Sequence, residues 1–372
     1  MDGLLTKRHQ VKLIHGGDIY SAQELLSHRE NAPEILDFSS NINPLGLPEG
    51  VKQAIINSID KYNAYPDPLC RELIINLSQF ERVPGHWLCC GNGAADLIYR
   101  LVWAQKPKKA MVLAPTFAEY EEALNTVSCQ VVHYELRAEK SFRIDENFLE
   151  VLSQINDLDM LFLCNPNNPT GQLISRKMIL QILKCCRALD ILCVIDECFN
   201  DFLEEPQEYS AREYLQEYDN LLILKAFTKI YAMAGIRLGH CISSNEKLID
   251  DLTKAGQPWS VSAVAQIAGI QAMREKEYIK RTKALVSRER AYLVRSLENL
   301  GIKVIASSAN YIFVKWPFNT RKPLHEMLFE KGILIRNCDN YYGLSPGYYR
   351  IGIRKHEDNA ALIAALISLA KQ

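Results

Sequence analysis

One lysine and one arginine, eight residues apart, could together bind an aldehyde that carries a phosphate group. Lys229 and Arg237 lie in the stretch LKAFTKIYAMAGIRLGHC, residues 224–241. A lysine in apolar surroundings has its ammonium form disfavoured, so its amine can attack a carbonyl carbon. Arginine offers a planar fork of N–H donors to phosphate oxygens, and Gly235 and Gly239 let the backbone turn closely around it. For this stretch alone, the alternative interpretation is a loop lysine beside a surface arginine.

Two further polar residues follow apolar runs that have the character of strands. Asp196 comes after the run 191–195, and Asn168 lies in NPNNPTG, residues 165–171, directly after the run 160–164. A buried carboxylate implies a cationic partner, such as a protonated pyridine nitrogen, and an amide can hold a phenolic oxygen. Either residue alone also fits a helix cap, a salt bridge or a turn. Because they match, with Lys229 and Arg237, the groups of pyridoxal phosphate, we expect this cofactor.

Two weaker signals lie at the ends of earlier apolar runs. The sequence Gly91-Asn92-Gly93-Ala94 opens a helical run, so the backbone N–H groups of Gly93 and Ala94 could bind a phosphate. Phe117, after Pro115-Thr116, could stack on a planar heterocycle. Taken alone, the first signal is also an ordinary turn and the second an ordinary core phenylalanine.

These residues need a scaffold that brings the ends of several strands together. Short apolar runs alternate with helical periodicity from residue 87 to residue 243, which is typical of a mostly parallel sheet with helices on both faces. Ligands of such α/β sheets gather at the carboxyl ends of the strands. The seven expected strands are 87–90, 110–113, 131–136, 160–164, 191–195, 221–224 and 240–243.

The chain of 372 residues is long enough for two domains. We expect an N-terminal arm over residues 1–48, a large domain over 49–270 and a smaller α+β domain over 271–372. The arm has an irregular pattern and is expected to pack on the small domain or on a partner subunit. A helical stretch at about 261–300 is expected to link the domains, and the small one contains the strand-like runs 303–305, 311–314, 333–335 and 349–353.

Composition argues against several classes of function. The formal net charge of -1 gives no general attraction to nucleic acids or to anionic membranes. No run approaches the length that spans a bilayer, and the N-terminus lacks the pattern of a secretory signal. The eleven cysteines include no Cys-x-x-Cys, and the adjacent pairs Cys89-Cys90 and Cys185-Cys186 suit neither disulfides nor zinc. We expect a cytoplasmic protein without a bound metal.

The motifs NPNNPTG, Asp196-Glu197, Thr228-Lys229 and AGIRLG resemble those of the fold-type-I pyridoxal-phosphate enzymes, in the branch that contains the histidinol-phosphate aminotransferases. The resemblance covers essentially the whole chain. It implies that Lys229 binds the cofactor covalently and that Asp196 holds the pyridine nitrogen. It further implies that Asn168 holds the ring oxygen and that Phe117 stacks on the ring.

The same resemblance implies how the phosphates and the subunits are arranged. The cofactor phosphate would be held by Gly93, Ala94, Thr228 and Arg237. Tyr65, in YPDP, would reach the cofactor phosphate of the other subunit, which implies a homodimer with shared active sites. Arg350 would bind the α-carboxylate of the substrate.

Two positions depart from the pattern of that branch. The aminotransferases usually carry a tyrosine three residues after the aspartate, and Phe199 stands there in this chain, so one hydrogen bond to the ring oxygen is missing. Ala226 stands where a hydroxyl residue often adds a bond to the phosphate. Both departures loosen the analogy with transamination.

The two ends of the chain are similar to a narrower group. HGGDIY at 15–20, DFSSNINPLG at 37–46 and LIRNCDNYYGLSPGYYRIGIR at 334–354 resemble the threonine-phosphate decarboxylases of cobalamin biosynthesis. The resemblance implies decarboxylation of O-phospho-L-threonine or O-phospho-L-serine to the amino alcohol phosphate. One methyl group separates these two substrates, and a contact worth about 1–3 kcal/mol would distinguish them.

A substrate with a carboxylate and a phosphate needs at least two cationic anchors. We expect His15, Arg336 and Arg354 to hold the substrate phosphate. Arg350 and the backbone beside Asn41 are expected to orient the carboxylate. The alternative is a surface salt bridge for any one arginine and a plain turn residue for His15.

The main alternative function is an aminotransferase that acts on histidinol phosphate or an aromatic amino acid with 2-oxoglutarate. It would share every cofactor residue, and its need for a 2-oxo acid distinguishes it. A pyridoxal-phosphate-binding regulator would carry a DNA-binding helix-turn-helix ahead of this fold, for which residues 1–48 leave no room. A nucleotide-binding α/β protein would carry Gly-x-Gly-x-x-Gly, and GNGAAD lacks the third glycine.

Overall fold

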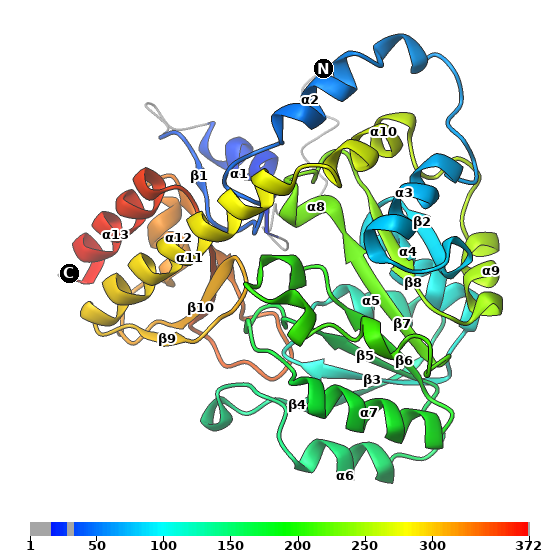
Figure 1. Cartoon of the computed structure of the whole chain (residues 1–372). Coiled ribbons are helices and arrows are strands. Elements are labelled where there is room, and N and C mark those ends of the chain that lie inside the picture. The colour runs from blue at the N-terminus through cyan, green and yellow to red at the C-terminus, as the bar shows by residue number, and fades with distance from the viewer. Residues whose placement is uncertain (1–15, 28–32, 371–372) are drawn as a thin grey trace, which may run out of the picture.

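The computed structural model describes residues 16–27 and 33–370. Its largest element is a seven-stranded sheet with the order β2-β8-β7-β6-β5-β3-β4 (Figure 1). Strands β4, β3, β5, β6 and β7 pair in parallel, whereas β8 is antiparallel to both of its neighbours. The prediction of a mostly parallel seven-stranded sheet is confirmed. Its strands are β2 (Leu88–Gly91), β3 (Lys109–Ala114), β4 (Gln130–Glu135), β5 (Met160–Cys164), β6 (Leu192–Asp196), β7 (Leu221–Ala226) and β8 (Gly239–Ile242).

Both faces of this sheet are buried, because alternate residues of each strand enter different helix layers. Leu161 and Ile195 belong to one core, together with α6 (Asn147–Gln154) and α7 (Arg176–Ala188). Phe162 and Val194 belong to a second core with α4 (Gly93–Gln105), α5 (Glu119–Asn125) and α9 (Glu246–Ala255). Burial on both faces explains why the strands are continuous apolar runs rather than alternating ones.

A smaller antiparallel sheet follows, with the order β12-β13-β10-β9. Its strands are β9 (Lys303–Ile305), β10 (Tyr311–Lys315), β12 (Arg336–Asn337) and β13 (Tyr348–Gly352). The long helix α11 (Lys276–Asn299) packs against α13 (His356–Ala370) and β9, and α12 (Leu324–Phe329) packs against α13. The proposed division between a large and a small domain falls in the last turn of α10 (Ala263–Ala272), just before α11. Short 3-10 turns are formed by Ile59–Lys61, Gly85–Trp87, Ala138–Lys140, Asn200–Phe202, Pro206–Glu208 and Arg212–Tyr214.

Two expected elements are each divided in the structure. The helical stretch 261–300 forms α10 and α11, which are separated at 273–275 because α10 packs against α2 (Glu49–Ile56) and α3 (Arg71–Glu81) while α11 packs against α13. The run 333–335 forms β11 (Ile333–Leu334) and leads into β12, because β11 pairs with β1 (Leu36–Asp37) and β12 with β13.

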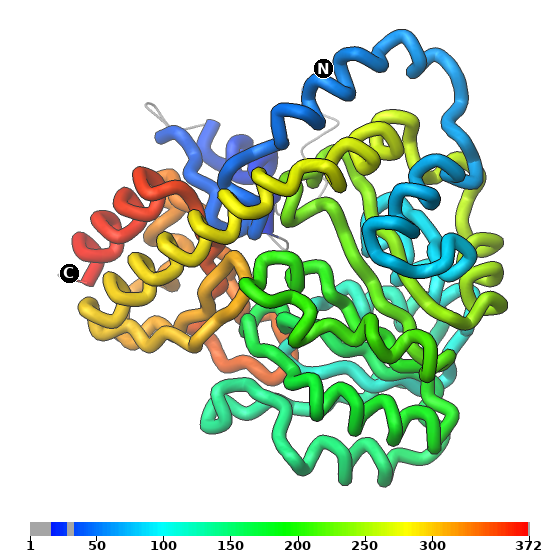
Figure 2. Tube along the Cα trace, viewed as in Figure 1, coloured from blue at the N-terminus to red at the C-terminus, as the bar shows by residue number. Residues whose placement is uncertain are grey.

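The N-terminal segment is more regular than its sequence suggests. It contains α1 (Ile19–Leu26), whose first turn is capped by Asp18 Oδ1, which accepts a hydrogen bond from the Ser21 N–H. Ala22 and Leu26 bury one side of α1. Strand β1 (Leu36–Asp37) pairs in parallel with β11, so this segment lies beside the C-terminal part of the chain (Figure 2).

Leu222 provides a test of the doubly buried sheet. It lies in β7 with 0% of its surface exposed, so Leu222→Ala should leave a cavity and lower the free energy of unfolding by about 2–5 kcal/mol. Leu189→Ala removes the same atoms from a side chain that is 42% exposed. Because little packing is lost there, it should change the free energy of unfolding by less than about 0.5 kcal/mol. Urea unfolding followed by circular dichroism makes the comparison, and equal losses would contradict the described packing.

Candidate active site

A cavity of about 530 Å³ lies at the carboxyl ends of the parallel strands. Phe117 follows β3, Asn168 follows β5, Asp196 ends β6 and Lys229 follows β7. The N-terminal segment and the smaller sheet complete the wall, so the cavity joins parts of the chain that are distant in sequence. The predicted residues that line it are Asn41, Ala94, Phe117, Asn168, Asp196, Thr228, Lys229, Arg237, Arg336 and Arg350.

Lys229 lies in the short helix α8 (Phe227–Ile230), which begins directly where β7 ends. Burial lowers the pKa of Lys229 to about 8, and the positive charge of Arg350 is the next largest cause. An ordinary lysine has a pKa of about 10.4 and is almost fully charged at pH 8. A substantial fraction of Lys229 is therefore a neutral amine near that pH and can act as a nucleophile.

Asp196 is held in place by two neutral donors. The Tyr120 hydroxyl donates to Oδ2 at 2.7 Å, and the Cys198 N–H donates to Oδ1 at 2.9 Å. Burial raises the pKa of Tyr120 well above its usual value, so this hydroxyl remains a donor. These neutral bonds fix the carboxylate, which is 5% exposed, but leave its charge for a cationic ligand. A protonated pyridine nitrogen fits this requirement.

Sequence reasoning missed Tyr120. The tyrosine stands three residues after Phe117, and its ring contacts Phe117 edge-on and stacks on Phe162 at 5.0 Å. The three-residue spacing between Phe117 and Tyr120 is the sequence feature that could have drawn attention to Tyr120. It could not reveal the bond to Asp196, which joins residues 76 positions apart.

A phosphate cradle is formed by the start of α4 and the segment before β8. Gly93 has a φ of +84°, and a Cβ atom there would lie 2.6 Å from Arg237 Nη2, so a side chain at this position would displace the guanidinium. Arg237 donates only weakly, to the carbonyls of Ala234 at 3.3 Å and Asn92 at 3.5 Å. Free N–H groups at the start of a 13-residue helix and an arginine beside them suit a phosphate. This observation shows that the residues present fit the expected cofactor.

Arg350 connects three distant segments at the floor of the cavity. Its Nη1 donates to Asn168 Oδ1 at 2.6 Å, and its Nη2 donates to the Ser39 carbonyl at 2.7 Å. Because the first bond uses the amide oxygen of Asn168, its amide hydrogens are available to a ligand oxygen. Arg350 Nε and Asn41 Nδ2 are both buried donors without a partner among the described residues. Two such donors beside one cavity indicate that a ligand supplies acceptors.

Arg336 is the second buried cation of the cavity, and like Arg350 it is 6% exposed. Its Nη2 donates to Asn340 Oδ1 at 3.0 Å, and its guanidinium lies 5.2 Å from the centre of the Tyr341 ring. Arg336 and Arg350 are cross-strand partners of β12 and β13. These contacts satisfy hydrogen bonds without neutralising charge, so the two guanidinium groups favour anionic ligands.

Of the predicted residues that the structure describes, Gly93, Tyr65 and Arg354 are not among those that line this cavity. Arg354 lies outside the lining and forms an ion pair with Asp358 at 3.5 Å, so its contact with a substrate phosphate stays a prediction. Tyr65 is 82% exposed and contacts the Trp259 ring with centroids 4.8 Å apart and planes tilted by 30°. His15 lies outside the described residues, although Gly16 and Gly17 after it line the cavity.

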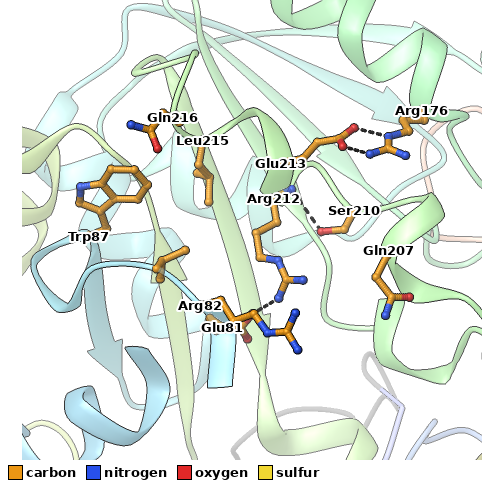
Figure 3. Close-up of a pocket in the computed structure, with 11 residues that line it drawn as sticks. Glu81, Arg82, Trp87, Arg176, Gln207, Ser210, Arg212, Glu213, Leu215 and Gln216 are labelled. Atoms are coloured by element: carbon orange, nitrogen blue, oxygen red, sulfur yellow. Dashed lines mark hydrogen bonds and ion pairs between the residues drawn. The ribbon is translucent and has the colours of Figure 1, made fainter. Parts of the chain in front are cut away.

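A second cavity, of about 290 Å³, lies between the end of α3 and the segment 207–216 (Figure 3). Its carboxylates already have partners, since Arg176 pairs with Glu213 and Arg212 with Glu81. It contains none of the predicted site residues. Within the described ranges, no group of three or more His, Cys, Asp or Glu residues could hold a metal ion. No helix in this part of the chain combines the length and the apolar character needed to cross a bilayer.

Comparisons with known proteins agree with this geometry. The sequence model of the family described as aminotransferase class I and II matches residues 33–366. The threonine-phosphate decarboxylase of Salmonella typhimurium is 36% identical over 95% of this chain and 95% of its own. Histidinol-phosphate aminotransferase 1 of Cupriavidus pinatubonensis is 32% identical over 89% of this chain and 87% of its own. The crystal structure of the histidinol-phosphate aminotransferase from Clostridium acetobutylicum superimposes with a TM-score of 0.84 at 28% identity, covering 91% of this chain and 99% of that one.

The lowered pKa of Lys229 predicts how its reactivity depends on pH. In cofactor-free protein, acetylation of Lys229 by acetic anhydride should be half-maximal near pH 8, because only the neutral amine reacts. Mass spectrometry of the peptide that carries Lys229 measures the rate. Arg350→Ala removes the second cause of the lowering and should move the midpoint upward. A midpoint near the ordinary lysine value of about 10.4 in the unaltered protein would contradict the described burial.

Proposed function

This chain belongs to the aminotransferase class I and II family, whose cofactor is pyridoxal 5'-phosphate, and we propose that it decarboxylates a small O-phospho-L-amino acid. The substrate is O-phospho-L-threonine or O-phospho-L-serine, and the product is the amino alcohol phosphate for cobamide biosynthesis. One observation carries this proposal. Two buried arginines, Arg336 and Arg350, line the cavity of Lys229 without a carboxylate to neutralise them among the described residues.

In the proposed reaction, the bond between the α-carbon and the carboxylate breaks, CO₂ leaves and a proton takes its place. Pyridoxal phosphate, when bound, supplies a ring that accepts the electron pair released by that bond. Asp196 would hold the protonated ring nitrogen of the cofactor, and the Tyr120 hydroxyl fixes the carboxylate of Asp196. Lys229 would hold the cofactor through its amine, and its Nζ could carry the proton to the α-carbon.

The two anionic groups of the substrate match the two arginines. Arg350 Nε and Asn41 Nδ2 are the unpartnered donors, and we assign the substrate carboxylate to them. Arg336, on the neighbouring strand, is then available to the phosphate. Gly16 and Gly17 line the same cavity, which supports a contact between the preceding His15 and the substrate.

The cofactor contacts proposed from sequence are compatible with the same arrangement. Phe117 lines the cavity and can stack on the ring, and Asn168 can donate to the ring oxygen. Gly93, Ala94, Thr228 and Arg237 surround the position proposed for the cofactor phosphate.

A homodimer with shared active sites is part of the proposal. Tyr65 and Trp259 form a tilted ring pair on the surface, and they are 82% and 47% exposed. Ile59 and Leu69 add apolar surface at 66% and 52% exposure. Exposed aromatic and aliphatic side chains of this kind suit a partner subunit, to whose cofactor phosphate Tyr65 would donate a hydrogen bond.

The alternative function is transamination of histidinol phosphate or an aromatic amino acid. The 32% identity with a histidinol-phosphate aminotransferase favours it, and that reaction would use the same cofactor residues. Phe199, which stacks edge-on against Tyr311, offers no hydroxyl to the ring oxygen and weakens this alternative. The two functions differ in whether CO₂ is released and in whether a 2-oxo acid is required.

The direct test incubates purified holoprotein with O-phospho-L-threonine, O-phospho-L-serine or histidinol phosphate, each with and without 2-oxoglutarate. Mass spectrometry follows CO₂, the amino product and glutamate. The proposal expects CO₂ from a phospho-amino acid in a 1:1 ratio with the amino alcohol phosphate, independent of 2-oxoglutarate. Glutamate formation without CO₂ would show an aminotransferase instead.

Arg336 and Arg354 offer a matched comparison for the phosphate contact. Arg336→Ala should raise KM for the phospho-amino acid at least about tenfold, because it removes a charge-assisted contact worth about 1.5–3 kcal/mol. Arg354→Ala deletes the same side chain outside the cavity and should change KM less than about twofold. Equal effects of the two substitutions on KM would contradict the assignment of Arg336.

A further inference from the structure

The loop 338–347, which joins β12 to β13, contacts both Arg336 and the large sheet. It is closed by its own backbone bonds, from the Cys338 N–H to the Tyr348 carbonyl and from the Leu344 N–H to the Tyr341 carbonyl. The Gly347 N–H also donates to Asp339 Oδ1 at 3.0 Å. These bonds make the loop a compact unit, so a shift at one end of the loop is expected to move the residues at the other end.

The first half of the loop holds the Arg336 guanidinium. Asn340 Oδ1 accepts a hydrogen bond from Arg336 Nη2 at 3.0 Å. Tyr341 is 8% exposed, lines the cavity and places its ring centre 5.2 Å from the guanidinium carbon. The direction of this guanidinium therefore depends on where residues 340 and 341 lie.

The second half of the loop rests on the edge of the large sheet. The Tyr342 ring stacks on the His133 ring of β4, with centroids 3.9 Å apart and planes at 7°. His133 Nε2 lies 2.9 Å from Glu121 Oε2 of α5, which fixes the imidazole ring. Gly343 packs against the end of β3, where a Cβ would lie 3.4 Å from the Ala114 carbonyl oxygen. The loop thus connects β12 to β3 and β4, at the edge of the sheet that positions the proposed cofactor residues.

We infer that Tyr342 is a positioning residue for Arg336. Its stack on His133 fixes the loop against the large sheet, so that Asn340 and Tyr341 aim the guanidinium into the cavity before the substrate arrives. Tyr342 is 55% exposed and does not line the cavity, so it acts through Arg336 rather than on the substrate. This inference rests on the proposed function only in assigning the anionic substrate group to Arg336.

The test compares Tyr342→Ala, Tyr342→Phe, His133→Ala and the double substitution Tyr342→Ala/His133→Ala in holoprotein. Tyr342→Ala should raise KM for the phosphorylated substrate about 3- to 10-fold, the range expected for a lost aromatic stack, with kcat within about twofold. Tyr342→Phe keeps the ring and should match the unaltered protein. The double substitution should be no worse than Tyr342→Ala, because both changes remove one interaction.

Tyr99→Ala is the matched control. Tyr99 contacts Trp103 with ring centroids 5.7 Å apart, and because both residues lie on α4 this ring contact stays within one helix. The control should leave KM unchanged. Amide hydrogen exchange in residues 338–347 provides a second measurement that requires no turnover. It should be faster in Tyr342→Ala than in Tyr342→Phe or Tyr99→Ala.

The outcomes separate this inference from the proposed function. Unchanged exchange in Tyr342→Ala, or faster exchange with an unchanged KM, would overturn the positioning role. If the protein transaminates histidinol phosphate instead of releasing CO₂, the proposed function fails. The same KM comparison then applies to histidinol phosphate, since that substrate also carries a phosphate, and a 3- to 10-fold rise in Tyr342→Ala would still support the role.

Discussion

Two buried positive charges, for which the described residues supply no neutralising carboxylate, are the constraint on which this candidate active site depends. Arg336 and Arg350 occupy adjacent strands, each is 6% exposed, and both line the cavity that contains Lys229. Burial of an ion is costly unless an opposite charge accompanies it. Amide and carbonyl oxygens of Asn168, Ser39 and Asn340 accept hydrogen bonds from the two guanidinium groups but carry no net charge. A bound anionic ligand would neutralise these charges, and the positive charge of Arg350 also contributes to the lowered pKa of Lys229.

The fold meets this constraint by joining segments that are distant in sequence at one edge of the large sheet. Arg350 connects the smaller sheet to Asn168 after β5 and to Ser39 in the N-terminal segment. Tyr342 and Gly343 connect the strand of Arg336 to β4 and β3. The residues proposed to bind the cofactor and the two arginines proposed to bind the substrate are therefore held by one framework. For this reason we expect a change at the exposed Tyr342 ring to affect Arg336.

The strands of the scaffold could be predicted from the sequence, whereas the contacts between distant side chains could not. Apolar runs buried on both faces are a local signal, so the strands and the positions of Lys229, Asp196 and Asn168 at their ends could be identified. The bond from Tyr120 to Asp196 and the stack of Tyr342 on His133 could not, because nothing in the neighbouring residues records which distant side chain they meet. Arg354 illustrates the same limit. Arg354 stands four residues after Arg350 in the same motif, just before α13. There it pairs with Asp358 and does not line the cavity.

The assignment of one arginine to each anionic group is tested most directly by calorimetric titration of the holoprotein with three ligands. Aminopropanol phosphate carries the phosphate but no carboxylate. In phosphothreonine amide an uncharged amide replaces the carboxylate, so its affinity compared with that of O-phospho-L-threonine measures the contribution of the carboxylate. Arg336→Ala should weaken every phosphorylated ligand by a similar factor. Arg350→Ala should weaken O-phospho-L-threonine far more than either ligand that lacks the carboxylate. Equal losses for all ligands in Arg350→Ala, or an unchanged affinity for aminopropanol phosphate in Arg336→Ala, would contradict the two-arginine account.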